Sequence, residues 1–187
     1  SIQARQRRHR TLPSLPGCPM KVEHEYRRCG AWAYIAAMDV HRAKFFGRCE
    51  HTSGIAAFDR LVDQVMSQPP YAKARRVFWI VDNGSSHRGS KSVQRLTGKY
   101  PNLVLVHGPV HASWLNQIEI YFSVLQRKAL TPNDFSSLNV LEKHILGFQK
   151  HYEAIAAPFE WKFTRQDLND LLDKIFSRGE ENPARAA

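Results

Sequence analysis

The chain has 187 residues, of which 43% are hydrophobic and 24% are charged. This length and balance predict one folded domain, or one domain with a helical appendage. No stretch approaches the ~20 apolar residues of a membrane span, and no apolar run follows the early arginines as in a secretory signal. The formal net charge of +10 favours a polyanionic partner, with nucleic acid ahead of an anionic membrane surface.

The first third of the chain is predicted to contain an arm, a hairpin and a helix. Residues 1–20 are rich in arginine and contain proline, which predicts an exposed basic arm. Apolar runs at residues 31–37 and 44–48, with a polar turn between them, predict a β-hairpin. Apolar residues at helical spacing then predict a helix over residues 54–67, which ends before Pro69 and Pro70.

Two strands with a helix between them are predicted next. Residues 77–81 (VFWIV) form a continuous apolar run, which is typical of a strand buried on both faces. A short helix is predicted over residues 91–100, and a second strand over residues 102–106. We expect these two strands to share one sheet with the hairpin, with the helix at 54–67 on one face.

The remainder of the chain is predicted to be helical. One helix is indicated by apolar residues at positions i, i+4, i+7 and i+11, namely Trp114, Ile118, Tyr121 and Leu125. A second apolar stripe runs through residues 138–155, and Thr164-x-x-Asp167 predicts a capping box that opens a last helix. The order of elements predicts an α/β layer fold, with a mixed sheet and a helical C-terminal side.

Carboxylates are scarce in the middle of the chain. Residues 64–133 contain two, Asp82 and Glu119, where uniform usage would place about six, and they contain nine Lys and Arg. A surface that binds phosphates excludes carboxylates because like charges repel, so two that are retained there require a reason. Mg²⁺ or Mn²⁺ supplies one, since these ions are commonly held by one or two carboxylates together with substrate phosphate.

Both carboxylates also have a structural interpretation. Asp82 could cap the turn that follows the predicted strand, and Glu119 could be a solvated position on its helix. The residues alone leave these interpretations evenly balanced with a metal site. A site of two such ions about 4 Å apart would stabilise the attacking and leaving oxygens of a phosphoryl displacement.

Two segments around these carboxylates carry a recognisable order of residues. VFWIVDNGSSHRG (77–89) contains Asp-Asn-x-x-x-His after a predicted strand, and PVHASWLNQIEIYFSVLQRKAL (109–130) contains Asn-x-x-Glu at the start of a predicted helix. Together with TPNDF (131–135) and FEWKFTRQDL (159–168), they resemble the catalytic domain of DDE transposases. The closest group is the bacterial insertion-sequence branch related to mariner elements, whose usual spacing matches the 36 residues between Asp82 and Glu119.

The resemblance implies an RNase H-like fold, a mixed sheet flanked by helices, and a triad of two Asp and one Glu or Asp. Asp82 would be its second member and Glu119 its third, with Asn83, His87 and Asn116 supporting the site. The triad would bind two Mg²⁺ or Mn²⁺ ions. The implied activity is nicking of element ends by water, followed by attack of the freed 3′-hydroxyl on target DNA.

The same resemblance implies double-stranded DNA, both element ends and target, as the partner. It allows a homodimer, and it places the protein in the bacterial cytoplasm at the nucleoid. We expect basic residues of the arm and of the motif flanks to contact phosphates, namely Arg5, Arg7, Arg8, Arg10, Arg88, Lys91, Arg127 and Lys128.

The chain departs from the family's pattern at its start. In relatives the first Asp lies one or two residues ahead of the segment that matches SIQAR (1–5), and a helix-turn-helix region lies further upstream. We therefore expect one N-terminally truncated catalytic domain, with an arm (1–20), an RNase H-like core (21–130) and C-terminal helices (131–187). We also expect its first strand and first metal ligand to be missing, and cleavage to be absent.

Several alternatives remain for individual residues and for the whole chain. Asp39 could replace the missing ligand, although a turn residue before His41 and Arg42 is favoured. His87 is equally well a satisfied polar residue, and Asn116 is slightly better explained as a helix cap. The chain could be a non-catalytic DNA-binding or assembly module. A glycosidase with paired carboxylates is disfavoured by the basic surface.

Overall fold

The computed structural model describes residues 1–84, 89–109, 116–158, 164–167 and 169–170. The chain divides into two compact units, Ser1–Ala157 and Pro158–Ala187. In the second unit, the predicted capping box is confirmed: the Asp167 N–H donates to the Thr164 hydroxyl at 3.2 Å, and the Thr164 N–H donates to Asp167 Oδ2 at 2.7 Å. Most of the predicted last helix lies outside the described residues.

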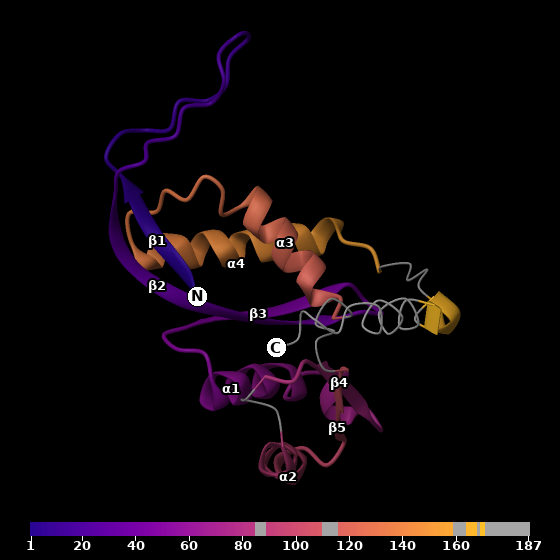
Figure 1. Cartoon of the computed structure of the whole chain (residues 1–187). Helices are drawn as coiled ribbons and strands as arrows, with labels where there is room; N and C mark the ends of the chain where they lie inside the picture. The colour runs from indigo at the N-terminus through magenta and orange to yellow at the C-terminus, as the bar shows by residue number, and fades with distance from the viewer. Residues whose placement is uncertain (85–88, 110–115, 159–163, 168, 171–187) are drawn as a thin grey trace, which may run out of the picture. The chain divides into compact units, whose positions relative to one another are not determined.

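Apart from β1 (Ile2–Arg7) and the 3-10 turn η1 (Tyr71–Lys73), which the sequence pattern does not predict, the described elements of the first unit confirm the predicted types and their order (Figure 1). None of the described helices combines the length and the apolar character needed to cross a membrane. The elements in chain order are β1 (Ile2–Arg7), β2 (Tyr26–Asp39), β3 (Lys44–Glu50), α1 (Ile55–Met66), the 3-10 turn η1 (Tyr71–Lys73), β4 (Val77–Val81), α2 (Ser90–Lys99), β5 (Leu103–His107), α3 (Ile118–Lys128) and α4 (Leu138–Ile155).

The strands form two sheets rather than the single sheet predicted. β1, β2 and β3 are antiparallel in that order, and β4 and β5 form a parallel pair. β1 pairs with the first half of β2, up to Trp32, while β3 pairs with residues 33–39 on the opposite edge. Residues 33–39 of β2 pair with β3 on one side, and among the described residues they have no partner strand on the side where β1 pairs with the first half of β2. In the same part of the chain, β4 pairs with β5 on one side and has no partner strand on its other side. No described strand joins these two edges, so the described strands form two separate sheets.

The predicted basic arm is shorter than residues 1–20. Its first part is β1, where Ala4 is completely buried and packs in the cluster around Leu125 and Leu141. Pairing with β2 satisfies part of the backbone of this segment, and the cluster around Leu125 and Leu141 buries Ala4. Residues 8–25, which we call the arm, form a hairpin that projects from the body of the unit (Figure 1), with bridges between Leu12 and Lys21 and between Leu15 and Cys18.

Helices cover both faces of the three-stranded sheet. Phe45 and Phe46 are consecutive in β3, so their side chains point to opposite faces. Phe45 packs with Ile118 and Tyr121 of α3, whereas Phe46 packs with Leu61 and other buried residues of α1. α3 and α4 lie on one face of this sheet and α1 on the other (Figure 1). This is the mixed α/β layer fold that the sequence predicts, with the helix at 54–67 on a sheet face as expected.

β4 buries one face, not both. Trp79 and Val81 are 8% and 6% exposed and belong to the core around α1. Phe78 and Ile80 alternate with them and are 61% and 60% exposed. The prediction of a strand covered on both faces is therefore wrong for the described part of the chain. Phe78 and Ile80, which make the apolar run continuous, line a cavity.

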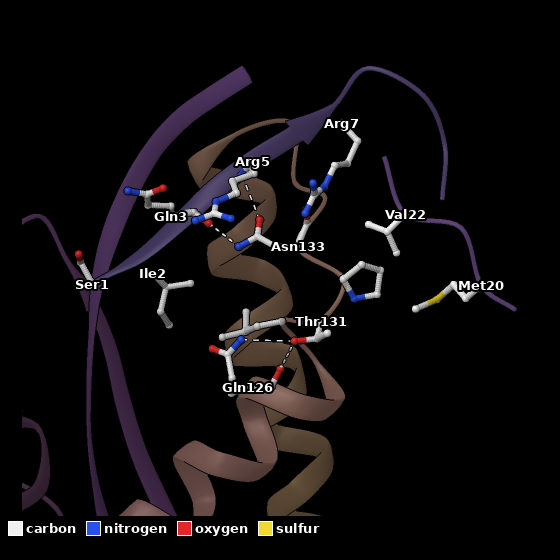
Figure 2. Close-up of a pocket in the computed structure, with 12 residues that line it drawn as sticks. Ser1, Ile2, Gln3, Arg5, Arg7, Met20, Val22, Gln126, Thr131 and Asn133 are labelled. Carbon is white, nitrogen blue, oxygen red and sulfur yellow. Dashed lines mark hydrogen bonds between the residues drawn. The ribbon is translucent and has the colours of Figure 1, made fainter. Parts of the chain in front are cut away.

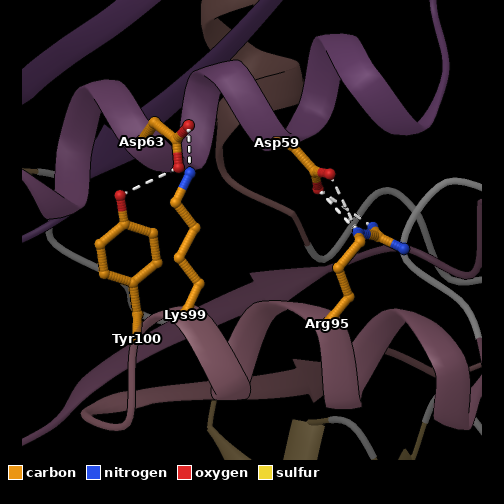
Figure 3. Close-up of polar contacts among 5 residues, drawn as sticks. All are labelled: Asp59, Asp63, Arg95, Lys99 and Tyr100. Carbon is orange, nitrogen blue, oxygen red and sulfur yellow. Dashed lines mark hydrogen bonds and ion pairs between the residues drawn. The ribbon is translucent and has the colours of Figure 1, made fainter.

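Polar contacts hold α2 against α1 (Figure 3). The Asp59 carboxylate accepts from the Arg95 guanidinium at 2.9 to 3.1 Å. One turn further along α1, Asp63 accepts from Lys99 Nζ at 2.7 Å and from the Tyr100 hydroxyl at 2.9 Å. The cations of α2 that face α1 are therefore offset by carboxylates.

Candidate active site

A cavity of about 730 Å³ lies between the two sheets. Residues 34–39 of β2 form one wall, and residues 77–82 of β4 and the turn after it form the other. α1 lines the cavity with Phe58 and Leu61, and the start of α3 lines it with residues 116–119 and Phe122. The unpaired edges of β2 and β4 thus border the same space.

Asp82 follows directly after β4 and lines this cavity. Its Oδ1 accepts from the Gly84 N–H at 2.9 Å, which is the turn-capping contact that the sequence allows. Asn83 Nδ2 donates to the Gly108 carbonyl at 2.9 Å, and the Gly108 N–H donates to the Val81 carbonyl at 2.9 Å. These bonds fix the ends of β4 and β5 together. Asp82 thus caps the turn after β4 and also contributes to the lining of the cavity.

Glu119 lies in the first turn of α3, whose start is fixed by Asn116. Asn116 Oδ1 accepts from the Ile118 N–H at 3.4 Å, and the Asn116 carbonyl accepts from the Glu119 N–H at 3.0 Å. These contacts belong to the turn before α3, because the N-cap residue of this helix is Gln117 and it has no side-chain capping bond. They leave Glu119 at the positive end of the helix dipole, where a carboxylate is favoured.

The structure brings Asp82, Asn116 and Glu119 to one cavity, although 36 residues separate the two carboxylates. Asn83 lies beside the cavity in the turn after β4, where it joins the two strands. His87 and Arg88 lie outside the described residues. Both motifs therefore contribute to the lining of one cavity, the first from a strand end and the second from a helix start.

Asp39 lines the same cavity, but its carboxylate is fully engaged. Oδ1 accepts from the N–H groups of His41 and Arg42, and Oδ2 accepts from the Arg42 guanidinium at 3.0 Å and from the Tyr71 hydroxyl at 2.7 Å. Burial alone would raise the pKa of Asp39, and the bonds from Tyr71 and Arg42 outweigh it and lower this pKa. The favoured interpretation of Asp39 as a turn residue is confirmed.

The donor set fits a hard divalent cation. Asp82 and Glu119 supply carboxylate oxygens, and Gln117, which lines the same cavity, has a buried Oε1 that accepts no hydrogen bond from the described residues. Oxygen ligands of this kind suit Mg²⁺ and Mn²⁺. The described residues contain no cluster of three or more His, Cys, Asp or Glu side chains that could hold a metal.

The predicted DNA contacts lie in different places. Arg8 and Arg10 are exposed on the arm, where Arg8 pairs with Glu25 at 2.7 Å. Arg5 and Arg7 are half-buried in β1, and Lys91 is exposed at the start of α2. Arg127 and Lys128 end α3, so they lie about 12 Å along the helix from Glu119. These last two residues flank the motif in sequence but not the cavity.

Two residues at the cavity are missing from the sequence-based prediction. Gln117 stands between the two motif residues Asn116 and Glu119, and its buried oxygen could not be anticipated from spacing. Arg76 precedes β4, is exposed and lines the cavity. In the sequence, Arg76 is distinguished only by its position within residues 64–133, the stretch that is rich in Lys and Arg and poor in carboxylates.

Residues 1–142 match the family described as DDE superfamily endonuclease. No curated protein and no solved structure matches the chain. The matched segment includes all the described strands, the cavity, and the carboxylates Asp82 and Glu119.

Proposed function

This chain belongs to the DDE superfamily endonucleases, and from that premise we propose that it is the catalytic domain of a transposase of the mariner-related insertion-sequence branch. Its substrate would be double-stranded DNA, which it would nick at element ends and join to a target. The observation that carries the proposal is the meeting of Asp82, Asn116 and Glu119 in one cavity. The family alone supports an endonuclease acting on DNA.

Asp82 and Glu119 would hold Mg²⁺ or Mn²⁺ in this site. When bound, the metal would supply Lewis-acid stabilisation of the attacking and leaving oxygens of a phosphodiester. The hydrogen bonds of Asn83 to Gly108 and of Asn116 to the start of α3 hold these two carboxylates in place. Arg76, an exposed cation on the same cavity, would attract the phosphate of the scissile strand.

We further propose that the complete site is RNase H-like and needs a third carboxylate from a strand in the cavity. A strand continuing β1 on its amino-terminal side would run beside residues 33–39 of β2 and face the unpaired edge of β4. The exposed Phe78 and Ile80 supply an apolar lining for it. One domain would then join both sheets, and without this strand metal affinity would be weak and cleavage absent.

The test is Mg²⁺-dependent nicking of supercoiled DNA by a longer chain that carries this strand. Asp82→Asn and Glu119→Gln should each lower nicking by at least about a thousandfold, since each removes a charged ligand of the reacting centre. DNA binding without metal should stay within about twofold of the parent chain, because neither residue is a cation that contacts phosphate.

Glu142→Gln is the matched control. It replaces a carboxylate by its amide on α4, outside the cavity, and should nick at the parent rate. Undiminished nicking by either cavity variant would end the proposal that these two residues carry the chemistry.

A non-catalytic DNA-binding or assembly module is the second candidate. It is favoured by the engagement of the Asp39 carboxylate with Arg42 and Tyr71, which argues against Asp39 as the third carboxylate of a metal site. If the longer chain binds DNA but shows no metal-dependent nicking, this second function is the correct one.

A further inference from the structure

A second pocket, of about 510 Å³, lies where β1 meets the segment after α3. Figure 2 shows Arg5 and Arg7 of β1 beside Asn133, with Met20 of the arm among the other lining residues. Asn133 joins the two segments, since its Nδ2 donates to the Gln3 carbonyl at 2.7 Å and its Oδ1 accepts from the Arg5 N–H at 3.0 Å. Hydrogen bonds between parts of the chain about 130 residues apart therefore build this pocket.

Two guanidinium groups line the pocket without an ion pair to a described carboxylate. The Arg5 guanidinium lies 4.6 Å from the centre of the Tyr26 ring, and its Nε is buried and donates to no described acceptor. The Arg7 guanidinium lies 5.4 Å from the same ring and donates to the backbone carbonyls of Asn133 and Glu23. These partners are neutral, so both positive charges remain uncompensated.

Arg28 adds a third positive charge on the same face of the strands. It lies directly opposite Arg5 in the register of β1 and β2, and like charges in that arrangement destabilise a sheet. The nearby Asp134 carboxylate accepts from the backbone N–H of Arg7 rather than from its guanidinium. The cations of α2, by contrast, pair with carboxylates of α1 (Figure 3). An external anion would relieve the repulsion at Arg5, Arg7 and Arg28.

We propose that this pocket binds phosphodiester groups of a DNA strand beside the catalytic cavity. Arg5 and Arg7 alternate on one face of β1, about 7 Å apart, and a DNA strand carries a phosphate every ~3.4 Å of its axis. The two guanidinium forks can therefore engage two phosphates of one strand. Stacking on Tyr26 pre-organises both forks.

The pocket and the cavity lie near opposite ends of one helix, α3. Gln126 lines the pocket from the last turns of α3, and Glu119 occupies the first turn of the same helix, about 10 Å away. That separation corresponds to roughly three base steps of a duplex. The inference rests on the proposed function only in taking DNA as the polyanion.

The experiment measures affinity of the 187-residue chain for a random-sequence duplex between about 50 and 200 mM salt, without divalent metal. Arg5→Gln should weaken binding about fivefold at the lower salt and reduce the slope of log affinity against log salt by about 0.9. The defect should then shrink roughly 3.5-fold at the higher salt. Arg5→Lys should recover the slope, because it keeps the charge, but only part of the affinity, because it lacks the fork.

Lys99→Gln is the control, since it removes the same charge from a residue that Asp63 already offsets, and it should leave the slope unchanged. An unchanged slope in Arg5→Gln overturns the proposal. So does an Arg5-dependent preference for inorganic phosphate or for polyglutamate over DNA at equal ionic strength. A reduced slope in Arg5→Gln upholds it even if the longer chain fails to nick DNA, so failure of the two proposals can be told apart.

Discussion

At the scale of single residues, a residue type that is rare in a segment is more informative than one that is common there. Asp82 and Glu119 can be singled out because a basic stretch retains them, and both line one cavity. The same reasoning cannot find Gln117 or Arg76, since neither is rare in its surroundings and their position depends on how β4 and α3 fold. Nor can it assign Glu50, whose partners come from β3 and α1.

Glu50 offers a test at this scale. It is 8% exposed and accepts from Arg60 at 2.6 and 3.0 Å and from Arg48 at 2.9 Å. The bonds from Arg60, with a smaller contribution from Arg48, outweigh burial and lower the pKa of Glu50 to about 2. Glu50→Gln should lower the free energy of unfolding at pH 7 by about 2 kcal/mol, because it leaves two cations without a charged partner.

The pH dependence of that difference has a definite sign. The folded pKa lies below the unfolded value of about 4.3, so ionised Glu50 stabilises the fold above that value. This stabilisation is lost as the pH falls from about 4.3 towards 2, and the parent and variant should converge there in urea unfolding. Glu25→Gln, which breaks the exposed pair with Arg8, is the control and should change little at any pH. A gap that widens in acid would contradict the assignment.

At the scale of elements, apolar periodicity predicts the type and order of the described helices and strands. It fails at β1, where the arginines of this segment obscure the alternation that buries Ala4, so that the pattern predicts a free arm instead of a strand. It also fails to show why β3 and α4 approach so closely. A side chain at Gly47 would collide with Gln149 and with the Tyr34 hydroxyl, which donates to Gln149 Oε1 at 2.9 Å.

Gly47→Ala should therefore lower the free energy of unfolding by about 2 kcal/mol, since the added methyl group overpacks the contact between β3 and α4. Gly147→Ala is a matched control, because Gly147 lies within α4 and a methyl group there would meet no described atom within 4 Å. That variant should gain about 0.5 to 1 kcal/mol from helix propensity. Opposite signs in thermal or urea unfolding would confirm the close approach, and equal effects would contradict it.

At the scale of the whole molecule, the sequence predicts one sheet and the described residues form two. The prediction cannot succeed from strand patterns alone, because pairing depends on what lies between β2 and β4. Val77–Val81 has the pattern of a strand buried on both faces, and Phe78 and Ile80 are the residues of that pattern whose side chains stay exposed in the described part of the chain. The difference thus points to the cavity as the place where the two sheets would join.

The proposed strand can be tested through Ile80 without any cleavage assay. Ile80 is 60% exposed in this chain, so Ile80→Ser should cost less than about 1 kcal/mol of unfolding free energy. In the longer chain, a strand in the cavity would cover Ile80, and the same substitution should cost about 2 to 3 kcal/mol. Val81→Ala removes a side chain that is 6% exposed already, so its cost should be equal in both chains. A cost of Ile80→Ser that stays equal in the two chains, measured by urea unfolding, would show that the added strand lies elsewhere and that the two sheets remain separate.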